Sequence, residues 1–180
     1  FVRISGGVIS SCPMKGTIDG VVPDGQARVL ADPKELAEHT TIVDLIRNDL
    51  NMIAGGVTVE RFRYIDRVST NRGEILQVSS LITGMLPEDY RQRLGTILFS
   101  MLPAGSVTGA PKKKTVDIIR GVEPGPRGFY TGVAGYFDGE TLESGVMIRF
   151  IEQTGEGMAF RSGGGITVQS DAESEYRELI

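Results

Sequence analysis

Four glutamates have the types and spacing that could support metal chemistry. Glu35 and Glu38 are three residues apart, as are Glu175 and Glu178, so each pair would share one face of a helix. Four carboxylates facing one another would repel without a cation. Oxygen ligands on rigid helices, completed by water and an anionic substrate, suit Mg²⁺. The two pairs therefore suggest a magnesium site, although either pair alone is also a common surface pattern.

A lysine and two glycine-rich segments could complete such a site. Lys15 stands in the short segment Cys12-Pro-Met-Lys-Gly-Thr17, where it is either an ordinary exposed cation or a desolvated nucleophile with a lowered pKa. The stretch from Gly105 to Pro111 leads into a predicted helix, whose free amides could bind an anion. Gly163-Gly-Gly165 would let a ligand approach the backbone closely, or would form a plain turn. The first stretch is not a Walker A motif, and neither matches the dinucleotide-binding fingerprint.

Composition narrows the range of functions. The chain has 180 residues, 40% of them hydrophobic, which is enough for one globular domain with a real core. One cysteine and one histidine argue against a zinc site. The net charge of −4 and the lack of a long basic stripe predict no nucleic-acid partner, and Lys112, Lys113 and Lys114 are interpreted as a solvated face. Without a long apolar run or a signal peptide, we expect no membrane partner and a cytoplasmic location.

The helix that would carry Glu35 and Glu38 is predicted to begin at Pro33, with Asp32 as its N-cap, and to run to Gly55-Gly56. Its apolar arc consists of Leu36, Ile42, Val43, Leu45, Ile46, Leu50, Met52 and Ile53. Glu35, Glu38, His39 and Asp49 fall inside this arc. Buried charges need partners, so these residues should be paired or bind a metal.

Two of these residues also have simpler explanations. Glu35 lies three residues after Asp32 and could be the acid of a capping box. His39 could be a hydrogen-bonded histidine packed beside Leu36 and Val43, which is the favoured interpretation. Glu38 lies beyond the first helical turn, so the capping explanation does not extend to it.

The other elements indicate the fold class. A hairpin around Gly6-Gly7 is predicted over residues 1–11, followed by a loop from Pro13 to Pro23. Strands are predicted at Val57–Val68, Glu74–Thr83, Phe129–Phe137, Glu143–Glu152, Met158–Arg161 and Ile166–Val168. Helices are predicted at Pro87–Leu102, from Pro111 to Gly121, and from near Ser170 with Glu173 at a capping-box position. The hairpin connections favour a mostly antiparallel α+β domain over a doubly wound parallel sheet.

Six motifs together resemble the chorismate-binding family, which includes anthranilate, isochorismate, salicylate and aminodeoxychorismate synthases. They are Pro13-Met-Lys-Gly-Thr17, Glu38-His-Thr-Thr-Ile-Val-Asp-Leu-Ile-Arg-Asn-Asp49, Gly105-Ser-Val-Thr-Gly-Ala-Pro-Lys112, Tyr130-Thr-Gly132, Gly163-Gly-Gly-Ile-Thr167 and Glu175-Tyr-Arg-Glu178. The resemblance implies two facing, mostly antiparallel sheets with helices outside. It also implies that residues 1–180 are a fragment, the C-terminal part of one catalytic domain truncated at both ends.

The resemblance implies a role for each motif residue. Glu38 and Glu178 would bind Mg²⁺ directly, with Glu35 and Glu175 supporting through water. The residues expected to line the chorismate pocket are Gly16, Thr17, Thr108, Tyr130, Arg149, Gly163, Gly164 and Gly165. Lys15 and Glu38 would be catalytic, and Lys15 favours one branch because anthranilate and isochorismate synthases usually carry alanine there.

That branch converts chorismate to 4-amino-4-deoxychorismate, the precursor of p-aminobenzoate and folate. Lys15 would attack C2 as the C4 hydroxyl leaves, and ammonia from a glutamine amidotransferase partner would then enter at C4. Gln77 stands where many family members have a histidine proposed to protonate the leaving hydroxyl, so the proton donor stays open. The alternatives are anthranilate or isochorismate synthesis, or a non-catalytic module that binds an anion or a partner and has kept the fold.

Overall fold

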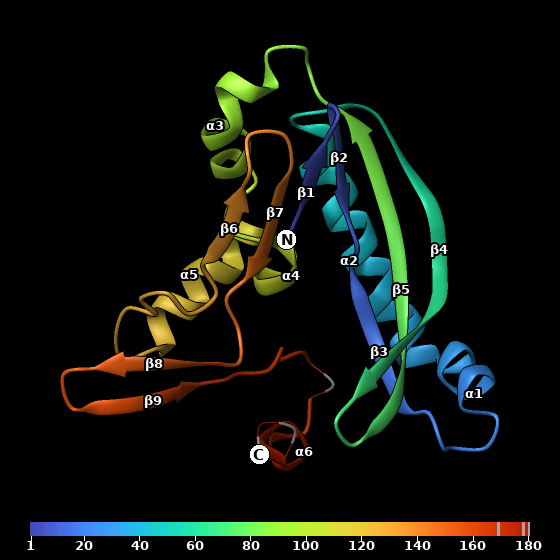
Figure 1. Ribbon diagram of the computed structural model, residues 1–180. Helices are drawn as coiled ribbons and strands as arrows, with labels where there is room; N and C mark the ends of the chain where they lie inside the picture. The colour runs from blue at the N-terminus through green and yellow to red at the C-terminus, as the bar shows by residue number, and fades with distance from the viewer. Residues whose placement is uncertain (169, 178, 180) are drawn as a thin grey trace.

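The structure, a computed structural model, describes residues 1–168, 170–177 and 179. Its main sheet has seven strands: β1 (Arg3–Ser5), β2 (Val8–Ser11), β3 (Met14–Asp19), β4 (Gly55–Thr70), β5 (Gly73–Met85), β6 (Val133–Phe137) and β7 (Leu142–Val146). The strand order is β3-β5-β2-β1-β7-β6, with β4 also paired to β5 (Figure 1). Strands β8 (Phe150–Thr154) and β9 (Gly157–Arg161) form a second, two-stranded sheet. All strand pairs among the described residues are antiparallel, which confirms the predicted α+β class.

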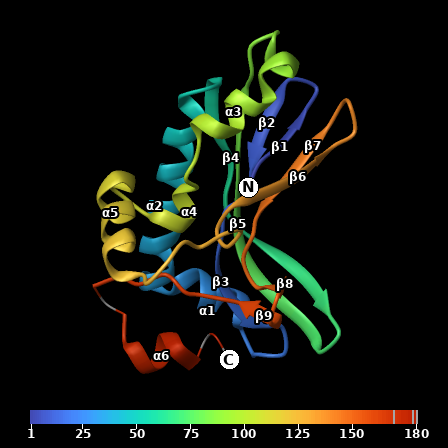
Figure 2. The same cartoon turned by 90° about the vertical axis from the view of Figure 1, so that its left-hand side faces the viewer.

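Six α-helices and one 3₁₀ helix are described. They are α1 (Gly25–Ala31), α2 (Pro33–Asn51), the 3₁₀ helix η1 (Tyr90–Arg93), α3 (Leu94–Ser100), α4 (Gly105–Thr108), α5 (Lys112–Val122) and α6 (Ala172–Arg177). The long helix α2 packs against β3, β4 and β5 and also contacts α4. Figure 2 shows α2, α4 and α5 together on one side of the main sheet. None of the helices within the described ranges is both long and apolar enough to cross a membrane.

Helix α2 begins as predicted. The Asp32 carboxylate accepts hydrogen bonds from the backbone N–H of Lys34 at 2.8 Å and of Glu35 at 3.0 Å, and Pro33 takes the first helical position, where its missing N–H costs nothing. The helix ends at Asn51, earlier than predicted, because Gly55 already pairs with Met85 in the sheet.

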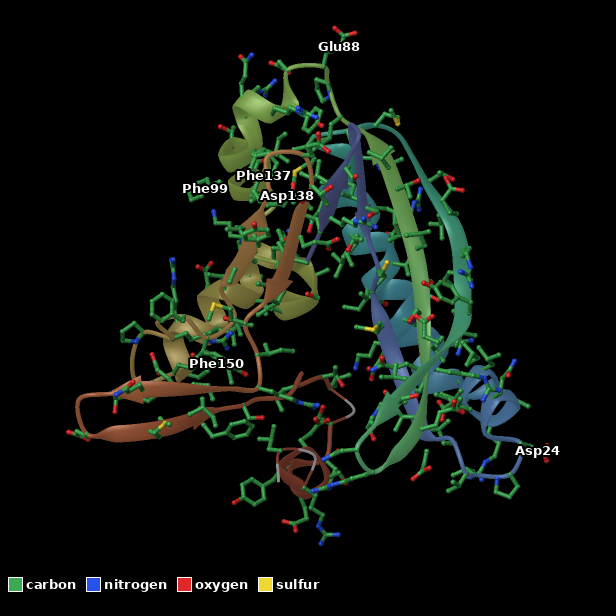
Figure 3. All side chains as sticks on the ribbon, viewed as in Figure 1. Asp24, Glu88, Phe99, Phe137, Asp138 and Phe150 are labelled. Carbon is green, nitrogen blue, oxygen red and sulfur yellow. The ribbon has the colours of Figure 1, made fainter. Side chains whose placement is uncertain are left out.

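One strand, β5, divides the main sheet into two halves. Its C-terminal part pairs with β2 through Ile82–Met85, and its N-terminal part pairs with β3 through Ile75–Ser79. In Figure 3, Glu88 lies in the loop beyond the C-terminal end of β5, and Asp24 lies in the turn that leads into α1. The hydrophobic core lies in the β2 half, where fully buried residues meet: Ile4, Ile9, Leu50 and Ile82. The β3 half therefore has room for polar side chains.

The apolar arc predicted on α2 is only partly correct. Val43 and Leu50 are buried, and Ile46 and Ile53 pack against the core. Met52 is 59% exposed because it follows the last helical turn, where helical spacing no longer sets the direction of the side chain. Leu36 is 42% exposed, and no contact in the structure explains this.

Three other segment predictions need correction. The loop predicted from Pro13 to Pro23 contains β3, and α1 follows directly after it. The strand predicted over Glu143–Glu152 is divided into β7 and β8, because Arg149 between them has φ of 53°, which a continuous strand does not allow. Ile166–Val168 is not a strand.

The N-cap of α6 differs from the prediction as well. The Asp171 carboxylate accepts a hydrogen bond from Ser174 N–H at 3.0 Å and so takes the capping position. Ser170 instead accepts a hydrogen bond from Thr167 N–H at 2.9 Å. Glu173 pairs with Arg177 and lies on the exposed side of this short helix.

Candidate active site

Lys15 lies at a bulge in β3. Met14 is opposite Ser79 on β5 and Thr17 is opposite Gln77, so β3 has one more residue than β5 between these pairs. Gly16 has φ of 88°, which glycine adopts without strain. A bulge turns side chains away from their regular alternation. Lys15 Nζ lies 2.5 Å from Glu38 Oε2 on α2. The segment predicted as a loop is therefore a bulged strand that orients Lys15 towards α2.

Glu35 faces the same bulge. A Cβ atom added at Gly16 would lie 3.1 Å from a Val29 methyl group and 3.3 Å from Glu35 Oε2. This carboxylate oxygen is buried and, in the part of the chain that the structure describes, has no hydrogen-bond partner. Burying an unpaired carboxylate oxygen is costly, so the position calls for a proton, a water molecule or a cation. Glu35 Oε2 thus faces the bulge that carries Lys15, and its role in the site stays a prediction.

His39 follows Glu38 on α2 and is fully buried. Its Nε2 atom lies 2.7 Å from Ser80 Oγ on β5, and its ring meets the edge of Phe62 at a centroid distance of 5.9 Å. This confirms the expectation of a buried, hydrogen-bonded histidine. The sequence offered no sign of Ser80 as its partner, because the two residues are 41 positions apart.

The pKa of His39 is below its ordinary value of 6.5. Burial is the main cause, and the positive charge of Arg63 acts in the same direction. The Lys15 backbone acts in the opposite direction and raises this pKa, but it is the smallest of the three effects. The imidazole is therefore neutral near pH 7.

Gln77 lies beside Thr17, one of the expected pocket residues. Its amide nitrogen makes a long contact of 3.5 Å with Thr17 Oγ1 across the β3–β5 pair. Gln77 on β5 therefore lies opposite Thr17, which is two residues after Lys15 on β3. An amide has no acidic proton to give, so the structure adds no proton donor at this position.

The glycine segment near the C-terminus meets two other expected site residues. A Cβ atom at Gly163 would overlap the Tyr130 hydroxyl, and one at Gly164 would lie 3.4 Å from Glu175 Oε2. Around Gly165, no described atom comes within 4 Å of an added Cβ. Tyr130, Gly163, Gly164 and Glu175 therefore form a second group, which long-range folding brings together.

Two expected pocket residues have less direct geometry. Thr108 is buried at the end of α4, and its hydroxyl is within hydrogen-bond distance of the carbonyl oxygens of Ala104, at 3.3 Å, and Gly109, at 3.2 Å. In this state Thr108 stabilises the turn into α5. Arg149 is exposed between β7 and β8, where its positive φ marks a change of chain direction.

Asp49, at the other end of α2, has the partner that its burial requires. Lys112 Nζ lies 2.6 Å from Asp49 Oδ1 and donates to the Met101 carbonyl oxygen at 3.1 Å. The prediction that Lys112, Lys113 and Lys114 form a solvated face is therefore wrong for Lys112. From the start of α5 the Lys112 side chain reaches Asp49 on α2, which no local pattern in the sequence indicates.

The metal site stays a prediction. Glu178, expected to be a direct ligand, lies outside the described residues. Among residues 1–168, 170–177 and 179, no three His, Cys, Asp or Glu side chains are close enough together to hold a metal ion. The unpaired oxygen of Glu35 and the carboxylate of Glu38 are nonetheless the hard oxygen donors that Mg²⁺ prefers, so the residue types fit this ion.

Two cavities lie apart from Lys15 and Glu38. One of about 490 Å³ lies between α4, α5 and residues 123–131, and its lining includes Thr108, Arg127 and Thr131. The other, of about 660 Å³, lies between α2 and β4, and its lining includes Thr40, Phe62 and Ala110. Of the expected site residues, Thr108 is the one that lines either cavity in the described part of the chain.

Known proteins are similar to this chain in sequence and in fold. An uncharacterized PabA-like protein from Pasteurella multocida is 56% identical over all of this chain and 56% of its own length. Anthranilate synthase component 1 of Spirochaeta aurantia is 35% identical over 98% of this chain and 37% of the relative. Aminodeoxychorismate synthase component 1 of Bacillus subtilis is 34% identical over 99% of this chain and 38% of the relative. The chain therefore spans about half the length of the Pasteurella relative and a smaller share of each of the other two.

A crystal structure gives the same result for the fold. Anthranilate synthase component I from Streptococcus pneumoniae superposes with a TM-score of 0.78 and 27% identity, covering 98% of this chain and 39% of that one. The family model for chorismate binding enzymes matches residues 1–180 in full. With the motifs, the antiparallel fold and these similarities in agreement, the chain belongs to the chorismate binding enzyme family.

Proposed function

We propose that this chain carries the catalytic residues for Mg²⁺-dependent amination of chorismate at C4, which yields 4-amino-4-deoxychorismate. The observation that carries the proposal is the position of Lys15, which the β3 bulge directs to Glu38 beside Gly16 and Thr17. A lysine is the one residue type in this group that can act as a nitrogen nucleophile. Similarity to an aminodeoxychorismate synthase component 1 is consistent with this choice.

In the proposed reaction the Lys15 amine forms a bond to C2 of chorismate. The ring double bonds shift, the C4–oxygen bond breaks, and the hydroxyl leaves as water after taking up a proton. Ammonia then forms the C4–nitrogen bond, the shift reverses, and the C2–Lys15 bond breaks. The net change is chorismate plus ammonia to aminated product plus water, with Lys15 regenerated.

Attack by Lys15 requires the ion pair with Glu38 to open. A neighbouring carboxylate favours the charged ammonium, whereas the nucleophile is the neutral amine. Bound Mg²⁺ would supply positive charge at the glutamates and a ligand position for the substrate carboxylate. Glu38 and Glu35 would hold this ion together with Glu175 and Glu178, and Glu38 would then no longer be available to Lys15.

The second group would hold the substrate carboxylates. Gly163, Gly164 and Gly165 would offer backbone N–H groups, Tyr130 a hydroxyl group, and Arg149 a guanidinium that can bind a carboxylate with two hydrogen bonds. Thr17 and Thr108 would complete the pocket. Ammonia would come from a glutamine amidotransferase partner, and a cytoplasmic location goes with this proposal.

Trapping the covalent intermediate tests the proposal. Full-length protein given chorismate and Mg²⁺ without ammonia should show, by mass spectrometry, an adduct on the peptide that contains Lys15. Lys15→Ala should lose the adduct and slow C4 amination, because the covalent route through the lysine is removed, whereas Lys113→Ala, which removes an exposed lysine on α5, should behave as the parent. Absence of the adduct, together with parental amination by Lys15→Ala, would exclude Lys15 as the nucleophile.

A second experiment tests the metal. Titration calorimetry of Glu38→Gln should show that Mg²⁺-dependent chorismate binding is lost, because the amide keeps the shape but not the charge of the carboxylate. Glu88→Gln, in the loop after β5, is the matched control. Unchanged Mg²⁺-dependent binding in Glu38→Gln would contradict the site assignment.

Anthranilate synthesis is the second candidate, because an anthranilate synthase component 1 is as similar to this chain as the aminodeoxychorismate synthase is. It would need ammonia to attack C2 directly, with no lysine adduct. The product formed from chorismate, Mg²⁺ and ammonium distinguishes the two, since anthranilate and 4-amino-4-deoxychorismate separate by chromatography. Anthranilate as the main product of the parental protein would favour this second candidate.

A further inference from the structure

A buried polar network lies directly behind Lys15 and Glu38. His39 Nε2 is 2.7 Å from Ser80 Oγ, and both residues are fully buried. Ser80 Oγ also accepts a hydrogen bond from Arg63 N–H at 3.0 Å, and Ser80 N–H donates to the Pro13 carbonyl oxygen at 3.0 Å. The network therefore joins α2, β4, β5 and the start of β3 through one serine.

Two points of this network lie next to the site residues in sequence. His39 follows Glu38 on α2, and Pro13 is two residues before Lys15 on the bulged strand. Ser80 contacts both segments, because its Oγ atom lies beside His39 Nε2 and its N–H group donates to the Pro13 carbonyl oxygen. Ser80 therefore links the helix that carries Glu38 to the strand that carries Lys15.

We propose that Ser80 and His39 are positioning residues, which set the separation and orientation of Lys15 and Glu38 through the His39–Ser80 hydrogen bond. This inference rests on the proposed function, in which Lys15 and Glu38 act on chorismate. Without the Ser80 hydroxyl, a buried imidazole nitrogen and the Arg63 N–H would both lose their partner. The chain would shift to recover hydrogen bonds, and α2 would move relative to β3.

Catalysis is sensitive to shifts of that size. A displacement of about 1 Å at reacting groups can cost about 100-fold in rate. In the proposed function, substrate binding also depends on the group formed by Tyr130 and Gly163–Gly165, which is separate from the hydrogen bonds of Ser80. The expected effect of losing the network is therefore on kcat more than on KM.

Ser79 provides a matched control. It is the neighbour of Ser80 on β5 and is equally buried, but its Oγ atom has no hydrogen-bond partner among the residues that the structure describes. Replacing it by alanine removes the same atoms from the same strand without breaking a hydrogen bond. Any difference between the two alanine variants then reports the network and not the loss of a buried hydroxyl as such.

The experiment compares Ser80→Ala, Ser80→Thr and Ser79→Ala in the full-length protein, with two readouts. The first is competitive acetylation of Lys15 against Lys113 by acetic anhydride, without metal or chorismate, measured by mass spectrometry. The second is kcat and KM for chorismate amination. We expect Ser80→Ala to change the acetylation ratio at least about threefold and to lower kcat about 10- to 100-fold, with KM within about threefold.

Ser80→Thr keeps the hydroxyl and should restore both readouts, and Ser79→Ala should match the parent. If Ser80→Ala does not fold, Ser80→Cys, which has a weaker hydrogen-bonding group, replaces it and should give a smaller change in the same direction. Parental acetylation and parental kcat in the Ser80 variant would overturn the proposal, as would equal effects in Ser79→Ala. A changed acetylation ratio, in a protein whose parent does not aminate chorismate, would refute the proposed function while supporting the positioning role.

Discussion

Helix α2 has a lysine–carboxylate pair at each end, and the two pairs differ in burial. The Asp49 side chain is 9% exposed, and Lys112 reaches both of its carboxylate oxygens and the Met101 carbonyl oxygen. The Lys15 and Glu38 side chains are 43% and 23% exposed. The first pair is enclosed and additionally hydrogen-bonded, whereas the second is open to solvent and to ligands.

This difference separates a structural pair from a functional one. Breaking a buried pair leaves an uncompensated charge, so the Asp49 pair contributes to holding α2 against α5. An exposed pair contributes little to stability, because water solvates its charges almost as well. The Lys15–Glu38 pair can therefore open during a reaction at low cost, and beside it lies the buried Glu35 Oε2 atom, which accepts no hydrogen bond from any residue that the structure describes.

The largest expected change in stability comes from Asp49→Ala. Lys112 would be left partly buried without its partner, which should lower the free energy of unfolding by about 3 kcal/mol. Asp44→Ala is the matched control, because Asp44 is an exposed residue of α2 that pairs with Arg47 one turn away, and its loss should cost less than about 0.5 kcal/mol. Urea unfolding measures both. Equal losses in the two variants would show that burial does not distinguish the pairs.

Gly16→Ala tests the bulge that presents Lys15. The positive φ and the contacts of the new Cβ with Val29 and Glu35 should together cost about 1–3 kcal/mol. Gly95→Ala is the control: Gly95 lies in α3 without a positive φ, and an added Cβ would meet no described atom within 4 Å. Alanine should stabilise that helix slightly. A Gly16 variant as stable as the Gly95 variant would contradict the tight packing at the bulge.

Lys15→Met sharpens the contrast by removing the cation at Glu38. Because Lys15 and Mg²⁺ would share the Glu38 carboxylate, we expect the variant to bind Mg²⁺ about two- to fivefold more tightly, the size expected from an exposed ion pair. Lys34→Met should have a smaller effect, since Lys34 Nζ is 4.0 Å from Glu38. Calorimetry on metal-free protein measures both affinities. Weaker Mg²⁺ binding by Lys15→Met would argue against shared use of Glu38.

The smallest expected effect concerns pH. The folded protein holds the pKa of His39 below the ordinary value of 6.5, so the unfolded chain takes up this proton first as the pH falls. The contribution of His39 to stability is thus complete above about pH 6.5 and declines as the pH falls through the lowered pKa. His39→Gln should show a weaker decline between pH 7.5 and 5.5 in urea unfolding. Parallel curves for parent and variant would exclude this linkage.

Local patterns predicted much of the fold. Asp32 and Pro33 predicted the start of α2, and Gly6-Gly7 predicted the β1–β2 turn, because caps and tight turns depend on neighbouring residues alone. The segment with β3 was missed, since its bulge removes the alternation that identifies a strand. Arg149 likewise divided a predicted strand through a backbone angle that its residue type does not favour.

For the site, the sequence by itself determined which side chains must have partners. Spacing on α2 placed Glu38, His39 and Asp49 on a buried face, and burial of polar groups requires compensation. Which partners they have was decided only by the tertiary structure: Lys15 for Glu38, Ser80 for His39 and Lys112 for Asp49. These partners are between 23 and 63 positions away, and one of them, Lys15, also lies on a bulged strand. Pairing over such distances follows from how α2 packs on the sheet.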